Sequence, residues 1–389
     1  MELGRPLQPG WGKQPLKRPL RIVHCFRSPV GGIFRHVRDL AEAQAADGHL
    51  VGLVCDSSTG GAHEERLFAE SAGRFALGIR RTPMQRHIGP GDIMSAWRTF
   101  KHIKELQPDV LHGHGAKGGV YARLFGSLLR ASRSRVARLY SPHGGSLHYD
   151  EDTLVGKVFF LLERIMARAT DHLLFVSDYE RQTYFRKVGR PRAATSLVYN
   201  GLLPAEFEPV PPAAGAADFL YIGMMRDLKG PDVFLKALAQ LAASGRKATA
   251  HFVGDGPDKP RYQAMIADLG LGESVTVHDA MPARKAFALA ETVVVPSRAE
   301  SMPYIVLEAI AAQKPVICTD VGGIPEIFAE EAGRLVEPGS VEALGKAMSA
   351  TLDDGNRQEL AGKMHDALRA RFSVEVMARD VMEAYRACR

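Results

Sequence analysis

Two glutamates separated by seven residues, Glu300 and Glu308, are the side chains of this sequence best placed to do chemistry. They lie in the stretch SRAESMPYIVLE, which follows the valine-rich run 292–296 and leads into the apolar, alanine-rich segment 304–313. This pattern predicts a strand, a tight loop and a helix. Pro303 suits the first turn of that helix, because proline lacks the N–H group that would be unpaired there.

The start of this predicted helix would form an anion site, since its free backbone N–H groups point at whatever lies before it. Two carboxylates repel a phosphate, but they accept strong hydrogen bonds from hydroxyl groups. A ligand with a hydroxyl-rich ring on each side of a diphosphate therefore fits Glu300 and Glu308. The alternative is a loop glutamate and a solvated helix glutamate near a favourable helix N-terminus. The residues around the anion would be Ser301, Met302, Pro303 and Tyr304.

The composition is that of an ordinary globular protein. The 389 residues are 46% hydrophobic and 24% charged, and they suffice for two domains of roughly 150–200 residues each. The 4 cysteines are far apart and form no C-x-x-C pair, so we expect reduced thiols and a cytoplasmic protein. No apolar run approaches the ~20 residues that span a bilayer.

Charge divides the chain into a basic and an acidic half. Residues 1–200 contain 30 lysines and arginines against 18 aspartates and glutamates, a net charge of +12, and residues 201–389 contain 20 against 26, a net charge of −6. The proline-rich and glycine-rich stretch 1–19 predicts a disordered basic tail. A basic half suits an acidic partner. Nucleic acid is disfavoured as that partner, because only 7% of residues are aromatic and no binding motif is present.

Strands and helices alternate along the first half. The apolar run 21–26 predicts a strand, which is followed by the loop Ser28-Pro-Val-Gly-Gly32 and by a helix with apolar residues at helical spacing. No G-x-G-x-x-G follows the strand, which disfavours a nicotinamide or flavin site. The alternation predicts a parallel sheet covered on both faces. Further strands are expected at 50–55, 109–112, 135–140 and 172–176, and helices near 92–107, 117–130 and 153–168.

Two of these strands end in loops that carry histidines, His112-Gly-His-Gly115 and Ser141-Pro-His-Gly-Gly145. Open α/β sheets bind ligands at the carboxyl ends of their strands, so His143 and His114 are candidate site residues. The spacing H-x-H also suggests a metal ion, but no third and fourth ligand accompany it at a suitable spacing in the sequence. We therefore expect no metal site.

The second half repeats the alternation after a segment rich in proline and alanine, 203–217, which is the clearest linker of the sequence. A strand at 218–223 and a helix at 231–241 are separated by a loop that contains Arg226 and Lys229. Cations at the carboxyl end of a strand can neutralise a diphosphate, and arginine does so with two parallel hydrogen bonds. Further elements are a strand at 274–278 and a last amphipathic helix at 374–385.

The spacing of the two glutamates resembles the E-x(7)-E signature of the family 4 retaining glycosyltransferases, which have the GT-B fold. Other elements resemble that family: the Gly-Gly pair after the first strand, Ser-Pro-His-Gly, an Asn-Gly turn, Lys-Gly, Gly-Asp-Gly-Pro and Gly-Gly-Ile-Pro-Glu. The resemblance covers about residues 20–388 and is strongest over 219–327. The family commonly has an arginine directly after the glycine that ends the strand at 218–223. This chain has Met224 there, and Arg226 comes two positions later.

The resemblance implies two Rossmann-like, doubly wound domains that face a central cleft. It also implies transfer of a hexose-type sugar from a UDP- or GDP-sugar to a hydroxyl acceptor, with retention at the anomeric carbon and with neither a metal nor another cofactor. The expected parts are the tail 1–19, an acceptor-side domain 20–202, the linker 203–217, a domain for the nucleotide-sugar 218–372, and a C-terminal helix 373–389 that crosses back to the first domain.

Roles for individual residues follow from the resemblance as well. Glu300 would meet the donor sugar and Glu308 the ribose of the nucleotide, while Lys229 and Arg226 would neutralise the departing diphosphate. His143 would lie near the donor sugar and would be the fourth catalytic residue. The remaining donor-binding residues would be Gly31, Gly32, Gly254, Gly256, His278, Gly322 and Gly323, and the acceptor-side residues would be His114 and Asn200.

The expected function is a step in the synthesis of a bacterial polysaccharide or glycolipid, such as exopolysaccharide or O-antigen, with a saccharide or lipid-linked saccharide as acceptor. Two alternatives remain. The same fold can act as a phosphorylase or a nucleotide-sugar epimerase, and a catalytically silent protein can bind a nucleotide-sugar without transferring it.

An anionic membrane surface is a further candidate partner. The segment 121–130 combines an apolar stripe with arginines, and Arg130, Arg133 and Arg135 cluster at its end. Such a basic amphipathic helix can lie on the inner face of the plasma membrane. A core-facing helix with a solvated arginine face has the same pattern.

Overall fold

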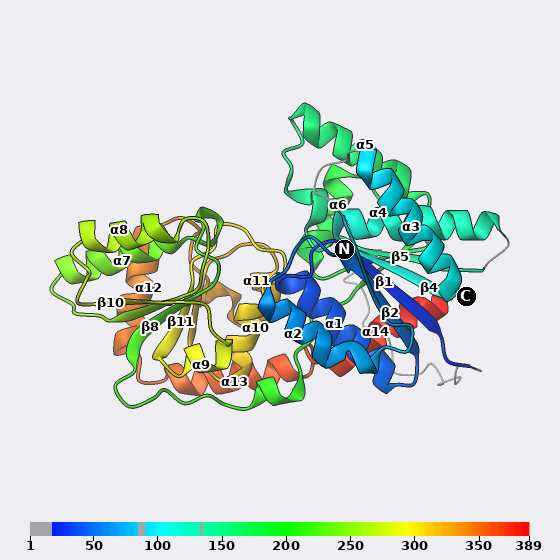
Figure 1. The fold of residues 1–389 in the computed structure, drawn as a ribbon. Coiled ribbons are helices and arrows are strands. Elements are labelled where there is room, and N and C mark those ends of the chain that lie inside the picture. The colour runs from blue at the N-terminus through cyan, green and yellow to red at the C-terminus, as the bar shows by residue number, and fades with distance from the viewer. Residues whose placement is uncertain (1–17, 85–89, 133–134, 389) are drawn as a thin grey trace, which may run out of the picture.

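The computed structural model describes residues 18–84, 90–132 and 135–388. Two α/β domains lie side by side, each built on one parallel β-sheet with helices on both faces (Figure 1). The predicted pair of doubly wound parallel sheets is therefore confirmed. The predicted tail 1–19 lies outside the described residues except for its last two positions.

The N-terminal sheet has 7 strands in the order β3-β2-β1-β4-β5-β6-β7, and every neighbouring pair is parallel. The strands are β1 (Arg21–Phe26), β2 (Leu50–Asp56), β3 (Ile79–Thr82), β4 (Val110–His114), β5 (Ala137–Ser141), β6 (His172–Phe175) and β7 (Ala194–Leu197). The helices between them are α1 (Gly31–Ala46), α2 (Ala62–Ser71), α3 (Pro90–Leu106), α4 (Gly115–Ala131), α5 (Leu154–Ala167) and α6 (Asp178–Lys187).

The C-terminal sheet has 5 parallel strands in the order β10-β9-β8-β11-β12. The strands are β8 (Ala217–Ile222), β9 (Ala250–Val253), β10 (Val275–His278), β11 (Ala290–Val295) and β12 (Val316–Cys318). The helices are α7 (Pro231–Ala243), α8 (Lys259–Asp268), α9 (Ala283–Phe287), α10 (Tyr304–Ala311), α11 (Ile324–Phe328), α12 (Val341–Asp353) and α13 (Arg357–Arg369).

Each sheet has a switch point where the strand order changes direction. In the N-terminal sheet it lies between β1 and β4, and in the C-terminal sheet between β8 and β11. A crevice opens at the carboxyl ends of the strands at such a point, because the connections on its two sides run to opposite faces. The loops after β1, β4, β8 and β11 therefore meet where the sequence analysis places its candidate residues.

The last helix, α14 (Val374–Ala387), belongs by its contacts to the N-terminal domain. It packs against α1, and its apolar residues share a buried cluster with Leu20, which precedes β1, and with Ile22 and Leu139 of the N-terminal sheet. Figure 1 shows this red helix beneath the N-terminal sheet, far from the C-terminal sheet that precedes it in the chain. The segment that the sequence predicts as a linker begins with a short 3₁₀-helix, Pro204–Phe207, and buries Phe207.

Some elements were not predicted, and two of the strands among them lie at edges of the N-terminal sheet. The strands β3, with the sequence IRRT, and β7, with the sequence ATSL, pair on one side only and lack an apolar run. Their positions depend on backbone hydrogen bonds to β2 and β6, which a local pattern does not encode. Among the described helices, none combines the length and the apolar character that crossing a bilayer would need.

Candidate functional site

A cavity of about 500 Å³ lies between the two domains, at the two switch points. The N-terminal domain contributes the loop after β1 and the histidine loop after β5, and the C-terminal domain contributes the loops after β8 and β11 with the start of α10. The lining residues that the sequence predicted are Gly31, Gly32, His143, Asn200, Lys229, Glu300, Ser301, Met302, Pro303, Tyr304 and Glu308.

The Glu300 carboxylate is held in place by two neighbours. Lys229 Nζ lies 2.6 and 2.8 Å from its two oxygens, and the Ser297 hydroxyl donates to Oε1 over 2.7 Å. Lys229 keeps about a third of its side chain exposed to the cavity, whereas Glu300 is largely enclosed. The cation can therefore reach a ligand without leaving its carboxylate partner.

Glu308 forms the contact that joins the two domains. Arg35, on α1 of the N-terminal domain, binds Glu308 through Nη1 and Glu206 through Nη2. Its guanidinium also lies over the ring of Tyr304, 4.2 Å from the centroid. Burial raises the pKa of Glu308, and the Arg35 cation opposes that rise. Arg35 was not predicted, because its partners lie 171 and 273 residues away and no local spacing connects them.

The start of α10 faces the cavity without a capping side chain among the described residues, and Pro303 occupies the N-cap position instead of the first turn. Asn200, a residue of the N-terminal domain, fixes the loop before α10, since its amide donates to the Met302 carbonyl over 2.9 Å. Gly322 and Gly323 hold it from behind. A Cβ at Gly322 would lie 1.9 Å from the Glu300 carbonyl oxygen, so the close approach requires glycine there. The free N–H groups of this helix end suit an anion.

His143 takes a left-handed backbone conformation, with φ of 50°. For a residue with a side chain this conformation costs about 1–2 kcal/mol and persists only when the surroundings hold it. One such restraint is Glu180, a buried residue of α6 that accepts hydrogen bonds from the backbone N–H groups of Gly144 and Val176. Burial raises the pKa of Glu180 to about 7. No local pattern predicts this role, since Glu180 lies 36 residues beyond Gly144 in the chain.

Behind His143 lies a cluster of buried histidines. His24, His112 and His114 form one group of potential metal ligands, and His36, His114 and His143 form a second. The spacing argument against a third ligand for the H-x-H pair was wrong in this respect, because His24 comes from the neighbouring strand β1 and pairs with His112 in register. Both nitrogens of His24, His112 and His114 have hydrogen-bonding partners. His114 lies behind His143 and is enclosed, so it is no part of the cavity wall.

Several predicted residues lie away from the cavity. Arg226 is exposed at the N-cap of a 3₁₀ turn, and Met224 takes its place on the cavity wall. His278 bonds His251 over 2.8 Å at the sheet edge. Gly254 and Gly256 serve close packing, since a Cβ on either would lie within 2.5 Å of a backbone oxygen in the loop after β8.

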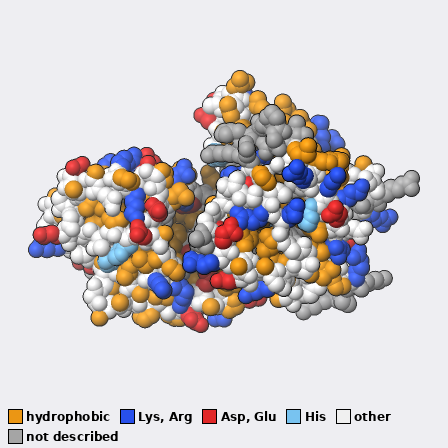
Figure 2. Space-filling view, viewed as in Figure 1, with side chains coloured by type: hydrophobic (Ala, Val, Ile, Leu, Met, Phe, Trp, Pro, Cys, Tyr) orange, Lys and Arg blue, Asp and Glu red, His pale blue; other side chains and the backbone are white. Residues whose placement is uncertain are grey.

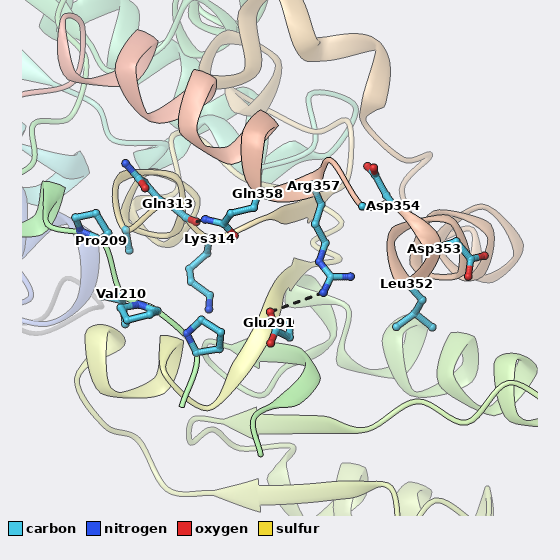
Figure 3. A pocket seen from close by; sticks show the side chains of 14 residues that line it. Pro209, Val210, Glu291, Gln313, Lys314, Leu352, Asp353, Asp354, Arg357 and Gln358 are labelled. Atoms are coloured by element: carbon cyan, nitrogen blue, oxygen red, sulfur yellow. Dashed lines mark hydrogen bonds and ion pairs between the residues drawn. The ribbon is translucent and has the colours of Figure 1, made fainter. Parts of the chain in front are cut away.

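A larger cavity of about 650 Å³ lies elsewhere, between the proline-rich segment and the start of α13 (Figure 3). Its charged side chains bind each other and the backbone: Arg357 lies 3.8 Å from Glu291, and Lys314 Nζ donates to the Ala290 carbonyl over 2.6 Å. None of the predicted site residues lies among the described residues that line it. We therefore assign the chemistry to the cavity between the domains.

Comparison with known proteins agrees with this geometry. Residues 30–205 match the family model described as Glycosyltransferase Family 4, and residues 204–369 match the one described as Glycosyl transferases group 1. The chain belongs to the family 4 type of glycosyltransferases. The boundary between the two matches coincides with the start of the proline-rich segment that separates the two sheets.

Individual relatives of this glycosyltransferase are distant but nearly full-length. The alpha-D-kanosaminyltransferase of Streptomyces kanamyceticus is 26% identical over 381 residues, which cover 82% of this chain and 97% of the relative. The crystal structure of Anabaena HepE in complex with UDP superimposes with a TM-score of 0.76 at 17% identity, over 94% of this chain and 99% of that one. The lipopolysaccharide outer core galactosyltransferase WaaB gives a TM-score of 0.67 at 17% identity, over 94% and 98%. These structures share the GT-B fold.

The ion pair across the cleft leads to a prediction about stability. In Arg35→Met, Glu308 and Glu206 lose their shared cation, and we expect urea unfolding at pH 7 to show a loss of roughly 1–3 kcal/mol, between the values typical of exposed and of buried pairs. The loss should shrink at pH 5. The pKa of Glu308 is raised in the folded state, so the stability that protonation supplies is present at low pH and is lost as the pH rises.

The control for this prediction is Arg246→Met, which removes an exposed ion pair with Asp353 inside the C-terminal domain and should change little. The double variant Arg35→Met/Glu308→Gln should recover part of the stability, because only Glu206, and no longer Glu308, is then a carboxylate without its cation. Equal losses at pH 5 and pH 7 would contradict the proposed origin of the effect.

Proposed function

We propose that this glycosyltransferase moves a hexose-type sugar from a UDP- or GDP-sugar to a hydroxyl acceptor, with retention at the anomeric carbon. The observation that carries the proposal is that one cavity between two switch points brings together Glu300, Lys229 and Glu308 with the uncapped start of α10. This set offers a cation and free N–H groups for a diphosphate, and a carboxylate on each side for hydroxyl-rich rings.

The site stabilises the departing diphosphate by electrostatics. Lys229 Nζ and the N-terminal N–H groups of α10 face the cavity, where charge develops as the bond between sugar and phosphate breaks. Glu300 lies beside the donor sugar and is held there by its contact with Lys229. Same-face attack lets a phosphate oxygen take the proton of the acceptor hydroxyl, so the mechanism needs no separate general base. Glu308 accepts hydrogen bonds from the ribose when Arg35 yields one of its oxygens.

Metal independence is part of the proposal. The diphosphate already has a lysine and a helix N-terminus as partners, and the sequence contains no aspartate-rich metal motif beside them. We therefore expect sugar transfer to persist in excess EDTA. Turnover that stops in EDTA and returns only with Mg²⁺ or Mn²⁺ would contradict this part of the proposal.

The identity of the nucleotide is open to a binding test. A ligand at ~100 times its dissociation constant stabilises the folded protein by ~2.7 kcal/mol, so UDP, GDP, ADP and dTDP can be ranked by melting temperature without an acceptor. Glu308→Gln should weaken the preferred nucleotide by roughly 1–3 kcal/mol, the usual range for a hydrogen bond to a charged group.

Glu300→Gln is the matched control for that test, since its proposed partner is the sugar. It should leave binding of the nucleoside diphosphate nearly intact while sugar transfer falls. The assignment of the two glutamates is wrong if Glu308→Gln binds the nucleotide as tightly as the parent, and the site as a whole is wrong if no nucleotide shifts the melt.

The acceptor that we propose is a lipid-linked saccharide at the inner face of the plasma membrane, in polysaccharide or glycolipid synthesis. Support comes from α5, which exposes an apolar stripe. Its members are between 49% and 79% exposed, and they recur at intervals of three and four residues along one face. They are Leu154, Val158, Leu161, Leu162 and Ile165, with Val155 beside them.

Cations follow one edge of this stripe. Lys157, Arg164 and Arg168 are exposed at intervals of seven and four residues, whereas the one acidic residue of α5, Glu163, is buried against Arg123. An apolar stripe with a cationic edge suits an anionic lipid surface, into which such a helix sinks by several ångströms. In Figure 2, hydrophobic and basic side chains mix over the upper part of the N-terminal domain, where Figure 1 places α3, α4 and α5.

The arginine cluster that the sequence offered for this contact has other partners. Arg130 binds Asp171 with distances of 2.6 and 3.1 Å and also donates to the Val136 carbonyl. Arg135 is exposed, and Arg133 lies outside the described residues. Two aromatic residues of α4, Tyr121 and Phe125, are buried in the core. We therefore transfer the proposed membrane contact from α4 to α5.

Vesicle flotation tests this contact. Leu161→Gln/Leu162→Gln should lower the fraction bound to vesicles of phosphatidylglycerol and phosphatidylcholine by about tenfold or more, since two half-exposed leucines leave the lipid. Lys157→Glu/Arg168→Glu should have a similar effect at low salt. The control Lys346→Glu/Lys363→Glu makes the same charge change on the C-terminal domain and should leave binding unchanged. The proposed membrane contact is wrong if the parent protein does not bind vesicles at low salt, or if the α5 variants bind vesicles as well as the parent does.

A further inference from the structure

A chain of buried hydrogen bonds runs from the C-terminal helix to the cavity. Gln44 on α1 donates through Nε2 to the Tyr385 hydroxyl over 3.4 Å, and its Oε1 lies 2.8 Å from His24 Nε2. His24 Nδ1 lies 3.0 Å from His114 Nε2, and His114 Nδ1 lies 3.0 Å from His143 Nε2. The inner members, Gln44, His24 and His114, are at most 1% exposed.

Burial keeps the imidazoles of this chain neutral. It lowers the pKa of His24 to about 4 and holds the pKa values of His114 and His143 well below the ordinary value. A neutral imidazole carries one proton, so it donates through one nitrogen and accepts through the other. A ring that donates a hydrogen bond through one nitrogen must therefore accept one at the other, so all hydrogen bonds along the chain point in the same direction.

Gln44 sets that direction, because its amide is oriented by Tyr385. The NH₂ group donates to the tyrosine hydroxyl, so the carbonyl oxygen faces His24 and accepts from Nε2–H. His24 Nδ1 then accepts from His114 Nε2–H, and His114 Nδ1 accepts from His143 Nε2–H. His143 is left with an unprotonated Nδ1.

Two side branches agree with this ordering. Tyr385 accepts from Gln44 and donates to His112 Nδ1 over 2.8 Å, and His112 then donates through Nε2 to the Ser141 hydroxyl over 2.9 Å. In the other branch, Asn200 donates to the Met302 carbonyl, so its oxygen accepts from His36 Nδ1–H over 3.0 Å. Each hydrogen bond in these branches therefore pairs one donor with one acceptor.

We propose that Gln44 is a positioning residue for the donor site: through His24 and His114 it fixes the tautomer of His143, so that His143 presents Nδ1 to the cavity as a hydrogen-bond acceptor. His143 lines the cavity, and its Nδ1 has no protein partner among the described residues. An acceptor nitrogen binds a hydroxyl group of a sugar through that group's proton. The proposal rests on the proposed function only for the identity of this ligand.

An added proton on His24 would reverse the direction of the hydrogen bonds that link His24, His114 and His143. Gln44→Glu places a carboxylate beside His24 and raises the pKa of that imidazole, which then donates from both nitrogens. His114 and His143 each pass a proton outward in turn, and His143 presents Nδ1–H to the cavity. The titratable groups around His24 are His36 on α1 and His112 and His114 on β4. Tyr385 on α14 lies on the other side of Gln44, and His143 lies beyond His114.

Nitrogen-15 NMR of histidine-labelled protein measures the tautomers directly. In the parent at pH 7.5 we expect His24, His114 and His143 as Nε2–H tautomers. In Gln44→Glu the signal of His143 should move to the Nδ1-protonated position, and in Tyr385→Phe, where the Gln44 amide is free to rotate, it should become a mixture. The control Gln240→Glu on α7 makes the same change far from these hydrogen-bonded histidines and should leave the spectrum unchanged.

Kinetics give the second readout. Gln44→Glu should reduce the rate of sugar transfer about tenfold, the effect of one lost hydrogen bond, while its affinity for the nucleoside diphosphate stays within about twofold of the parent. Activity should return as the pH rises, because the extra proton is present below the raised pKa and is lost above it. A purely structural defect would lower the melting temperature without this pH dependence.

Three results would overturn the proposal: an Nε2–H tautomer of His143 in all variants, a changed tautomer with unchanged sugar transfer, or stoichiometric metal bound to the imidazoles of the purified protein. Failure of the proposed function would look different. The parent would then bind no nucleotide, while the tautomers of His24, His114 and His143 would still follow the substitutions at Gln44 and Tyr385.

Discussion

The contact between Arg35 and Glu308 is the interaction on which the arrangement of the site depends. It joins α1 of the N-terminal domain to α10 of the C-terminal domain, and Tyr304 and Glu206 share the same guanidinium. One cation thereby neutralises carboxylates from two separate segments in a setting with little water, where an unpaired charge is expensive. Because the same carboxylate faces the cavity, ligand binding and domain contact involve the same atoms.

The two walls of the cleft differ in their electrostatics. On the C-terminal wall Lys229 and Glu300 form a close salt bridge. On the N-terminal wall burial lowers the pKa values of five histidines and leaves them as neutral hydrogen-bonding groups. A charged wall suits a diphosphate and a neutral, directional wall suits hydroxyl groups, which is the division that a nucleotide-sugar needs.

The net charge of the N-terminal half is a poor guide to where its cations act. Arg130 and Arg138 both bind Asp171, and Arg123 is fully buried against Glu163. The surface that stands out is instead the exposed stripe of α5, which a globular protein in water would normally cover.

The sequence by itself determined the alternation of strands and helices, the two parallel sheets and the glutamate-bearing loop, because each of these follows from local periodicity, glycine placement and the spacing of Glu300 and Glu308. It also placed His143 on the cavity wall. Only the tertiary structure decided which residues from distant segments meet: Arg35 with Glu308, Glu180 with the histidine loop, and His24 with His114 across neighbouring strands. Such partners are chosen by strand order and by the crossing of α14. A one-dimensional pattern carries no information on these, since it records separation along the chain and not distance in space.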